Sequence, residues 1–247
     1  MTTGNTITRK TNHRSIAFIS DIHGNVPALL AVLDATRRAG VEKVVCLGDI
    51  IDMGPQPEAC VQILIDNGIE CVQGNHELLN EAKISPLMEI EQWTAQRISA
   101  RTRDYLDSLP QTLTIENKGS RVICTHGSPR SQTEGLLRDT PADQLAEMLA
   151  SVEPYDAVVA GHTHVQMVRR ENTRTIMNVG SVGMPFKEPF NGAPPEILSW
   201  AEYGVIRWDG TQMAFELCRI NYSLNDFALT FDDTFPDRYA WLKQWLS

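Results

Sequence analysis

The sequence predicts an α/β protein built as a four-layer α/β/β/α sandwich, in which two mixed β-sheets pack face to face and helices lie outside them. The first observation behind this prediction is a repeated strand–helix–strand pattern in the early half of the chain, which is typical of parallel strands with crossover helices. The second observation is that short alternating segments separated by tight turns follow residue 164, which favours antiparallel strands.

The length of 247 residues allows one substantial hydrophobic core, so we expect a single domain over residues 15–247. Residues 1–14 are polar, and we expect them to form a flexible leader. This leader lacks the apolar core of a secretory signal, and no stretch of the chain is apolar for long enough to span a bilayer. We therefore expect a cytoplasmic protein that does not bind membranes.

The composition also bears on the partners of the protein. The formal net charge is -9 and no run of Lys or Arg occurs, whereas a protein that grips long nucleic acid through its phosphates usually carries a basic face. We therefore expect no long nucleic acid among the partners. The five cysteines never form a Cys-x-x-Cys pair, which indicates reduced core thiols rather than disulfides or a zinc–thiolate site.

The first strand and helix are the clearest elements of the sequence. An apolar segment over residues 16–20 leads into Asp21-Ile22-His23, which predicts a buried parallel strand with a polar loop at its carboxyl end. A helix is predicted over residues 26–39, because a proline lies in its first turn, two arginines lie in its last turn and a glycine follows. A second apolar segment, over residues 44–47, ends in Gly48-Asp49 and completes a βαβ unit.

The next part of the chain repeats this order less clearly. A turn-rich loop precedes a predicted helix over residues 58–67, which ends before a glycine. Residues 69–73 predict a weaker strand that leads into Gly74-Asn75-His76-Glu77. A helical pattern with an apolar face then fills most of residues 78–110.

The remaining elements are a hairpin, a helix, a strand and a second hairpin. Residues 112–124 predict the first hairpin, with a turn at 117–120. Thr140, followed by a proline, predicts the N-cap of a helix that reaches residue 151, and a strand follows over residues 156–160. Residues 204–217 predict the second hairpin, and a last helix is expected over residues 237–246.

Polar side chains follow five of the predicted strands at the point where each strand ends. They are two Asp, one Asn and five His: Asp21, His23, Asp49, Asn75, His76, His126, His162 and His164. A single His at a strand end is more often a structural residue, but packing gives no reason for five strand ends to carry such side chains. Because these ends meet at one edge of an α/β sheet, we expect a metal site there. With oxygen and nitrogen donors and no thiolate, zinc, manganese, iron, cobalt and nickel all fit.

These residues also make the chain resemble the calcineurin-like metallophosphoesterases. The five signature blocks of that family occur here in the family's order: Asp21-Ile22-His23, Gly48-Asp49, Gly74-Asn75-His76-Glu77, His126-Gly127 and Gly161-His162-Thr163-His164. Two longer stretches, at 21–25 and 178–183, resemble the small bacterial phosphodiesterase branch of the family.

The resemblance implies a role for each of these side chains. One cation would be held by Asp21, His23 and His164, the other by Asn75, His126 and His162, and Asp49 would bridge the two. His76 would be no ligand but would stand over the scissile phosphate and protonate the leaving oxygen or stabilise its charge. We expect two divalent metal ions, Mn²⁺ first, with Fe, Zn, Ni and Co as alternatives.

The loop after Asp49 argues against a phosphoprotein phosphatase. It resembles the Gly-Asp-x-Val-Asp-Arg-Gly loop of Ser/Thr protein phosphatases, but Met53 stands in the place of their phosphate-binding arginine. Asp52 in the same loop is a second catalytic candidate, because the resemblance implies that it hydrogen-bonds His76 and raises the pKa of that side chain. The alternative for Asp52 is a turn-forming aspartate.

Asn25 and Arg130 are the candidates for substrate binding. Asn25 comes directly after the first motif, at the expected mouth of a pocket, and Arg130 follows His126 closely enough to meet a substrate phosphate. The alternative for Arg130 is a solvated loop residue. The chain departs from the usual sequence of the bacterial branch at residues 186–187 and 190–195. Exposed prolines and aromatic residues over residues 186–200 are compatible with a homodimer edge.

We therefore expect a phosphoesterase that hydrolyses small phosphodiesters, or monoesters, through a metal-activated hydroxide with His76 as acid or charge stabiliser. Two divalent ions about 3.5 to 4 Å apart clamp a phosphate and lower the pKa of a bridging water toward neutrality. One alternative is a dinucleoside polyphosphate hydrolase. Another is a catalytically silent metal-binding scaffold of the same fold, against which the intact ligand set and His76 argue.

Overall fold

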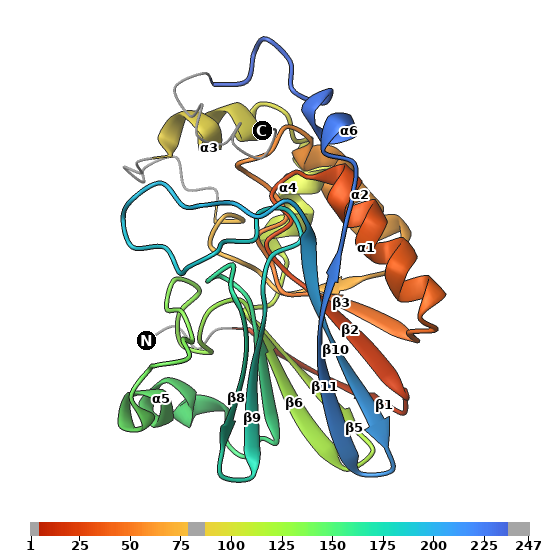
Figure 1. Cartoon of the computed structure of the whole chain (residues 1–247), viewed down its shortest axis with the longest axis vertical. Coiled ribbons are helices and arrows are strands. Elements are labelled where there is room, and N and C mark those ends of the chain that lie inside the picture. The colour runs from red at the N-terminus through yellow and green to blue at the C-terminus, as the bar shows by residue number, and fades with distance from the viewer. Residues whose placement is uncertain (1–4, 79–86, 237–247) are drawn as a thin grey trace.

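The computed structural model describes residues 5–78 and 87–236, and within these it shows two mixed β-sheets packed face to face (Figure 1). The five-stranded sheet has the order β11-β10-β2-β3-β4 and the six-stranded sheet the order β1-β5-β6-β7-β9-β8. Helices lie on the outer faces of both sheets, so the predicted four-layer α/β/β/α sandwich is confirmed. No helix among these residues combines the length and the apolar character that crossing a bilayer requires.

The five-stranded sheet contains the first βαβ unit of the chain. Three parallel strands lie at its centre and one edge: β2 (Ser15–Ile19), β3 (Lys43–Cys46) and β4 (Glu70–Cys71). The hairpin of β10 (Ala201–Asp209) and β11 (Gln212–Ile220) completes the sheet, with β10 antiparallel to β2. The parallel order and the late hairpin were both predicted.

The six-stranded sheet is assembled around the first hairpin. Its strands are β1 (Thr6–Thr11), β5 (Thr112–Asn117), β6 (Ser120–Thr125), β7 (Ala157–Ala160), β8 (Gln166–Glu171) and β9 (Arg174–Val179). The hairpin of β5 and β6 turns at Lys118 and Gly119, both of which have positive φ angles, as a two-residue turn between twisted strands requires. β6, β7 and β9 run parallel, so their carboxyl ends lie at the same edge.

Three apolar layers hold this arrangement together. In β2, Ile16 and Phe18 face the six-stranded sheet while Ala17 and Ile19 face the helices, because a strand buried on both sides is apolar at every position. On the other side of the molecule, Val158 of β7 packs against a helix. The core therefore fixes each strand, and with it the position of the strand end.

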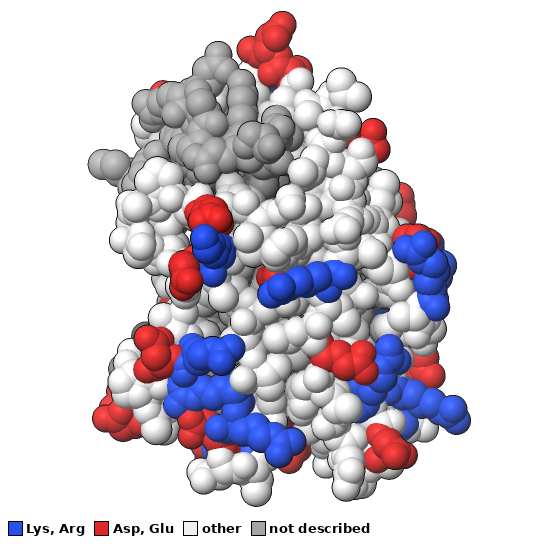
Figure 2. Space-filling view, in the orientation of Figure 1, with Lys and Arg blue, Asp and Glu red and all other residues white. Residues whose placement is uncertain are grey.

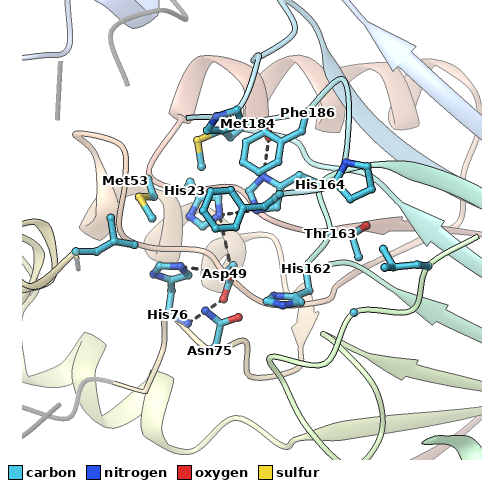
Figure 3. Close-up of a pocket in the computed structure, with 16 residues that line it drawn as sticks. His23, Asp49, Met53, Asn75, His76, His162, Thr163, His164, Met184 and Phe186 are labelled. Carbon is cyan, nitrogen blue, oxygen red and sulfur yellow. Dashed lines mark hydrogen bonds and ion pairs between the residues drawn. The ribbon is translucent and has the colours of Figure 1, made fainter. Parts of the chain in front are cut away.

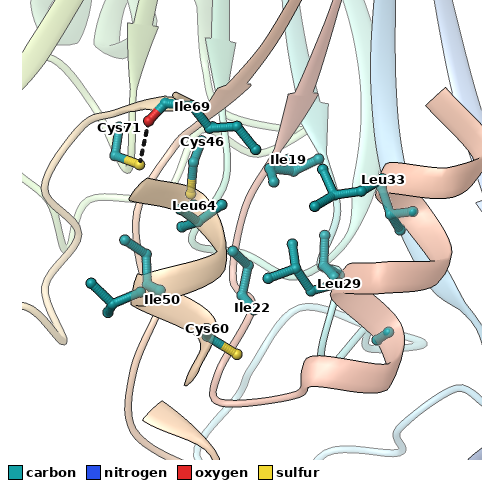
Figure 4. Packing of buried hydrophobic residues seen from close by; sticks show 14 of the residues in the cluster. Ile19, Ile22, Leu29, Leu33, Cys46, Ile50, Cys60, Leu64, Ile69 and Cys71 are labelled. Carbon is teal, nitrogen blue, oxygen red and sulfur yellow. Dashed lines mark hydrogen bonds between the residues drawn. The ribbon is translucent and has the colours of Figure 1, made fainter. Parts of the chain in front are cut away.

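Six α-helices and one 3₁₀ turn are described. They are α1 (Val26–Arg38), α2 (Pro57–Asp66), α3 (Met88–Ala95), α4 (Ala100–Asp107), α5 (Ala142–Leu149), the turn η1 (Ala150–Val152) and α6 (Leu224–Ala228). Figure 4 shows how α1 and α2 cover the five-stranded sheet, with Leu29 and Leu33 of α1 and Leu64 of α2 directed toward Ile19 and Cys46. α5 covers the six-stranded sheet.

The start of α1 shows why the first loop turns where it does. The Oδ1 atom of Asn25 accepts a hydrogen bond from the backbone N–H of Ala28 at 3.1 Å, which caps the helix, and a proline lies in the first turn. The preceding Gly24 has a φ of 60° and its backbone lies against Gly54, so that a Cβ atom would come within 2.6 Å of the Gly54 carbonyl oxygen. Asp21 and His23 are thus placed directly before a fixed helix start.

Two expectations from the sequence are corrected. Residues 6–11 belong to no loose leader but form the edge strand β1, parallel to β5, with largely exposed side chains. An edge strand gains its stability from backbone hydrogen bonds rather than from an apolar face, which is why hydrophobic periodicity did not indicate it. At α5, Pro141 occupies the N-cap position, and the Thr140 hydroxyl accepts a hydrogen bond from the Leu137 N–H instead.

The remaining differences lie in the helical region and at the end of the chain. The pattern between residues 78 and 110 is divided into α3 and α4, with Ser99 as the N-cap of α4. The helix predicted over residues 237–246 lies outside the described residues.

Candidate metal centre

The polar side chains at the strand ends converge on one place where the two sheets meet. Backbone hydrogen bonds join the loops that carry them: Asp21 N–H donates to the Gly48 carbonyl at 3.0 Å, and Gly161 N–H donates to the His126 carbonyl at 2.8 Å. Two groups of potential metal ligands result, and within each group the ligand atoms lie within 4.8 Å of one another.

The first group consists of Asp21, His23 and His164. Asp21 Oδ1 lies 3.2 Å from His164 Nε2 and 4.0 Å from His23 Nε2. All three side chains are buried. The structure therefore brings together the three residues that the resemblance assigns to the first cation.

The second group consists of Asp49, His126 and His162. Asn75 joins it, because its Oδ1 atom lies 3.1 Å from His126 Nε2. Asp49 Oδ2 lies 3.1 Å from His126 Nε2 and 3.9 Å from His23 Nε2, so one carboxylate oxygen lies between the two groups. This is the position that a bridging ligand requires.

The histidine tautomers leave the ligand nitrogens free of protons. The Nδ1 atoms of His23, His126 and His164 each lie within 3.1 Å of a backbone carbonyl, of Ile51, Leu47 and Met184 respectively. A carbonyl only accepts, so Nδ1 carries the proton and Nε2 keeps its lone pair.

Several of the potential ligand atoms have lone pairs without a hydrogen-bond partner, and this fits bound cations. His23 Nε2 and His164 Nε2 face each other at 3.3 Å, although neither has a proton to give in this tautomer. The buried Asp21 Oδ1 has no hydrogen-bond partner. Lone pairs that face one another in a buried site repel unless positive charge lies between them, so the donor set fits divalent metal ions.

The charges of His23 and Asp21 support the same reading. Burial and the neighbouring His164 and His76 lower the pKa of His23 to about 3, so its ring is neutral, as a ligand must be. For Asp21, burial acts to raise the pKa, but the interaction with His164 outweighs it and the pKa falls to about 2. Both groups therefore hold their ligand form at neutral pH. For His126, burial acts to lower the pKa, but Asp49 raises it to about 9, and positive charge from bound cations would oppose that rise.

The backbone at the ligands is unusual. Asp21, His23, Asp49, His162 and His164 all have φ angles between 49° and 67°, a left-handed conformation that only a minority of non-glycine residues adopt. Local strain of this kind clusters at functional sites because the surrounding structure imposes it.

His76 lies beside the two groups rather than within either. Its Nδ1 atom lies 2.9 Å from Asp52 Oδ2, and its Nε2 atom lies 4.0 Å from Asp49 Oδ2. The predicted contact between Asp52 and His76 is thus present. Burial alone would lower the pKa of His76, but the charge of Asp49 and the hydrogen bond to Asp52 raise it to about 10. Positive charge from bound cations would oppose that rise.

Glu77 organises the site, a role that the sequence did not indicate. Its fully buried carboxylate accepts hydrogen bonds from the N–H groups of Asp49, Ile50 and Gly74, at 2.7 to 2.8 Å. It therefore joins the loop that carries Asp49 to the loop that carries Asn75. The only signal was its place in the Gly-Asn-His-Glu block, which says nothing of its partners.

A second supporting pair comes from the stretch 178–183. The Asn178 amide donates to the Gly161 carbonyl at 2.6 Å and to the Thr163 hydroxyl at 2.9 Å. The Ser181 hydroxyl donates to the Asp21 carbonyl at 2.7 Å. Asn178 and Ser181 thus fix the loops of His162, His164 and Asp21 from behind.

The two residues expected to bind substrate lie elsewhere. Asn25 is fully buried, and besides capping α1 its amide donates to the Gly183 carbonyl and the Tyr222 hydroxyl. The guanidinium of Arg130 pairs with both carboxylate oxygens of Glu134, at 2.6 and 2.9 Å. Neither residue lines the cavity beside the metal ligands, because local hydrogen bonds hold both side chains away.

A cavity of about 450 Å³ opens over the centre (Figure 3). His23, Asp49, Asn75, His76, His162 and His164 line it on the side of the ligands. The other described lining residues are mostly apolar, and Figure 3 shows Met184 and Phe186 beside His164, across the cavity from Asn75 and His76. A substrate would therefore meet the ligands and His76 together.

Comparisons with known proteins agree with this site. Residues 15–194 match the calcineurin-like phosphoesterase superfamily domain. An uncharacterised protein of Methanocaldococcus jannaschii is 29% identical over 224 residues, which are 85% of this chain and 88% of that protein. The phosphodiesterase YfcE of Escherichia coli is 25% identical over 174 residues, 69% of this chain and 80% of YfcE. The crystal structure of a metallophosphoesterase from Sphaerobacter thermophilus has a TM-score of 0.69 at 26% identity and covers 95% of this chain and 98% of its own.

Proposed function

Since this chain belongs to the calcineurin-like phosphoesterase superfamily and is a metal-dependent phosphoesterase, we propose that it hydrolyses small phosphodiesters at a centre of two divalent cations. One observation carries the proposal: Asp49 lies between two groups of ligand atoms, within 3.9 Å of a histidine nitrogen of each. A shared carboxylate of this kind is what a two-metal centre needs.

In this proposal each ligand keeps the role that the sequence suggested. Asp21, His23 and His164 would hold the first cation, Asn75, His126 and His162 would hold the second, and Asp49 would contact both. The support is the distances within each group and the Nδ1 contacts that aim the Nε2 lone pairs inward. Only two carboxylates face the two cations, so the centre keeps a positive surplus for an anionic phosphate.

When bound, the two cations polarise the phosphate and lower the pKa of a water molecule enough to make it a nucleophile near neutral pH. In its protonated form His76 carries a proton at Nε2, and the ring lines the cavity beside the ligands. It gives this proton to the leaving oxygen or stabilises the charge that develops there. Asp52 orients the ring and keeps it protonated through the 2.9 Å contact at Nδ1.

As the pH is raised, we expect an Asp52→Asn variant to lose activity at a lower pH than the parent does. His76 acts in its protonated form, so activity falls as the pH rises through the pKa of His76. Because the carboxylate of Asp52 raises that pKa, its replacement by an amide should move the alkaline limb of kcat down by about one to three pH units. A pH profile of kcat measures the shift, and an unmoved alkaline limb would show that Asp52 does not control the ionisation.

The oxygen and nitrogen donors suit Mn, Fe, Zn, Ni and Co alike, and among these we propose Mn²⁺ as the first candidate. The five cysteines are free, and none is among the ligand groups. Reduced thiols support a cytoplasmic location, which we propose on that ground.

A small phosphate ester, rather than a nucleic acid or a membrane, is the proposed partner. On the face in Figure 2, basic side chains lie among acidic ones. Several basic side chains of the strands form ion pairs with acidic ones, among them Arg174 with Glu153 and Arg207 with Glu216. A homodimer through residues 186–200 stays a prediction.

Turnover of bis-p-nitrophenyl phosphate tests the proposal. The protein loaded with Mn²⁺ should release p-nitrophenol, chelation with EDTA should abolish the release, and added Mn²⁺ should restore it. A panel with diadenosine polyphosphates and p-nitrophenyl phosphate separates the diester from the polyphosphate and monoester readings. Failure to hydrolyse any phosphoester would instead support the silent metal-binding scaffold.

A further inference from the structure

One side of the cavity is an apolar wall. It is formed by Met53, Leu87, Met184 and Phe186, which pack in one cluster, together with Pro189, Phe190 and Pro195. Phe186 stacks on the ring of His164, with centroids 4.2 Å apart and planes 19° from parallel. The wall therefore begins at a metal ligand and continues away from it, where the ester group of a bound phosphate would lie.

The wall is supported from behind and is not a loose surface. Met53, Met184 and Phe186 belong to a buried cluster with Trp93 of α3 and Phe227 of α6. Buried clusters of this kind keep side chains in fixed positions because they are closely packed. The wall thus presents a preformed surface.

Residues 185–198 form a hairpin-like arm that carries the outer part of the wall. Phe186 bridges to Ile197, and Lys187 N–H donates to the Glu196 carbonyl at 3.0 Å. Prolines at 189, 194 and 195 restrict the tip between these strands. The tip carries Phe190, which lines the cavity although 65% of its surface is exposed.

The exposed ring of Phe190 is not an isolated apolar side chain, because Pro189, Pro195 and Phe186 line the same cavity. Contiguous exposed apolar surface of this kind marks ligand-binding grooves. Among the described residues, Leu229 is even more exposed, at 84%, but it lies outside the cavity. Phe190 therefore combines exposure with a position at the site, where a planar group could stack on it.

The charges around the cavity restrict the substrate further. Among the described residues that line the cavity, 16 of which are drawn in Figure 3, none is Lys or Arg. Lys187 of the arm is paired with Glu196 at 2.8 Å. A polyphosphate chain carries charges beyond the cations that need such side chains, whereas a single phosphate does not. The cavity volume of about 450 Å³ is adequate for one phosphate and one ring system.

We propose that the cavity selects esters with a single phosphate and one planar aromatic group, and that this group lies on the apolar wall between Phe186 and Phe190. The proposal rests on the proposed function, since it names the substrate class of the same site. The planar group is an aryl ring or a nucleobase, which share the chemistry of a flat apolar face.

Binding of two matched pairs of non-cleaved ligands tests the proposal. Phenylphosphonate and methylphosphonate differ in an aryl ring, and the methylenephosphonate analogues of adenosine 5′-monophosphate and ribose 5-phosphate differ in a nucleobase. With the Mn²⁺-loaded protein, isothermal titration calorimetry should give a Kd at least about tenfold lower for the member of a pair that carries the accepted ring. The pair with the larger ratio identifies the ring as aryl or nucleobase.

Phe190→Ala should reduce that ratio about 3- to 10-fold, which is the effect expected for loss of one aromatic contact. Leu229→Ala is the matched control, since it removes another exposed apolar side chain outside the cavity, and it should leave the ratio as in the parent. Both side chains are exposed, so neither change should prevent folding.

Three results would overturn the proposal: equal affinities within both pairs, a ratio that survives Phe190→Ala, or tighter binding of diadenosine tetraphosphate than of any single-phosphate ligand. A change of molecular mass in Phe190→Ala by light scattering would also overturn it, since the tip would then be an interface between copies of the chain. Parallel assays with bis-p-nitrophenyl phosphate distinguish the proposed phosphoesterase activity from the proposed ring selectivity. Turnover without a preference for the ring would refute only the selectivity of the apolar wall.

Discussion

Replacing His76 by alanine is expected to lower kcat about 10²- to 10⁴-fold while the protein keeps both metal ions, because an acid–base group contributes about that much. The ring lies beside the ligand groups and contacts Asp52, and neither of the metal-ligand groups formed by the described residues includes it. Kinetics with bis-p-nitrophenyl phosphate measure the loss, and elemental analysis of the same preparation measures the metal content.

The matched control is His13→Ala, which removes a histidine that pairs with Glu42 at the end of β2 and β3 opposite to the ligands. It should alter neither kcat nor metal content. A His76→Ala protein that loses metal together with activity would show that His76 is a ligand, and the role assigned to it would be wrong.

Asp49→Asn is expected to have a larger effect on metal binding than His76→Ala. The amide keeps an oxygen that can accept from the His76 N–H, the contact that Asp49 Oδ1 makes at 2.9 Å. It removes the negative charge that both cations share, so the affinity for both should fall by more than about 100-fold, the upper range for loss of an outer-shell partner. Turnover should fall with it. Metal titration followed by calorimetry measures the two affinities.

Asp104→Asn is the control for charge alone, because Asp104 is an exposed carboxylate on α4. It should bind two equivalents of Mn²⁺ like the parent. If Asp49→Asn also bound two equivalents of Mn²⁺ with unchanged affinity, the carboxylate of Asp49 would not contribute to binding either cation, and the bridging role would be wrong.

Much of the fold could be predicted because both of its main signals are local. The segment 16–20 is apolar at each of its first four positions, which indicates a strand buried on both faces, and β2 is such a strand. Proline in the first turn of α1 and arginines in its last turn marked the helix correctly. β1 was missed because its stability comes from pairing with β5, more than 100 residues away, and pairing across such a distance leaves no local pattern.

The convergence of the ligands could be predicted for a topological reason. Parallel strands place their carboxyl ends at one edge, so Asp21, Asp49 and Asn75 had to approach each other once β2, β3 and β4 were parallel. The hydrogen bonds of Glu77 and Asn178 could not be predicted in this way. They depend on which backbone groups remain unpaired when the loops meet, and only the assembled structure determines that.

Asn25 and Arg130 lie outside the cavity lining for the same reason. Both residues were assigned to substrate because they follow ligand motifs closely in sequence. In the structure a nearer partner takes each side chain: the start of α1 takes Asn25 and Glu134 takes Arg130. Proximity in sequence to a ligand places the backbone near the site, but local capping and ion pairing decide where the side chain points.

Anomalous diffraction from crystals grown with Mn²⁺ tests the central claim most directly. The arrangement of Asp49 between the two ligand groups predicts two peaks about 3.5 to 4 Å apart, one beside Asp21 and His164 and the other beside His126 and His162, with Asp49 in contact with both. A single peak, or peaks away from these side chains at saturating Mn²⁺, would contradict it.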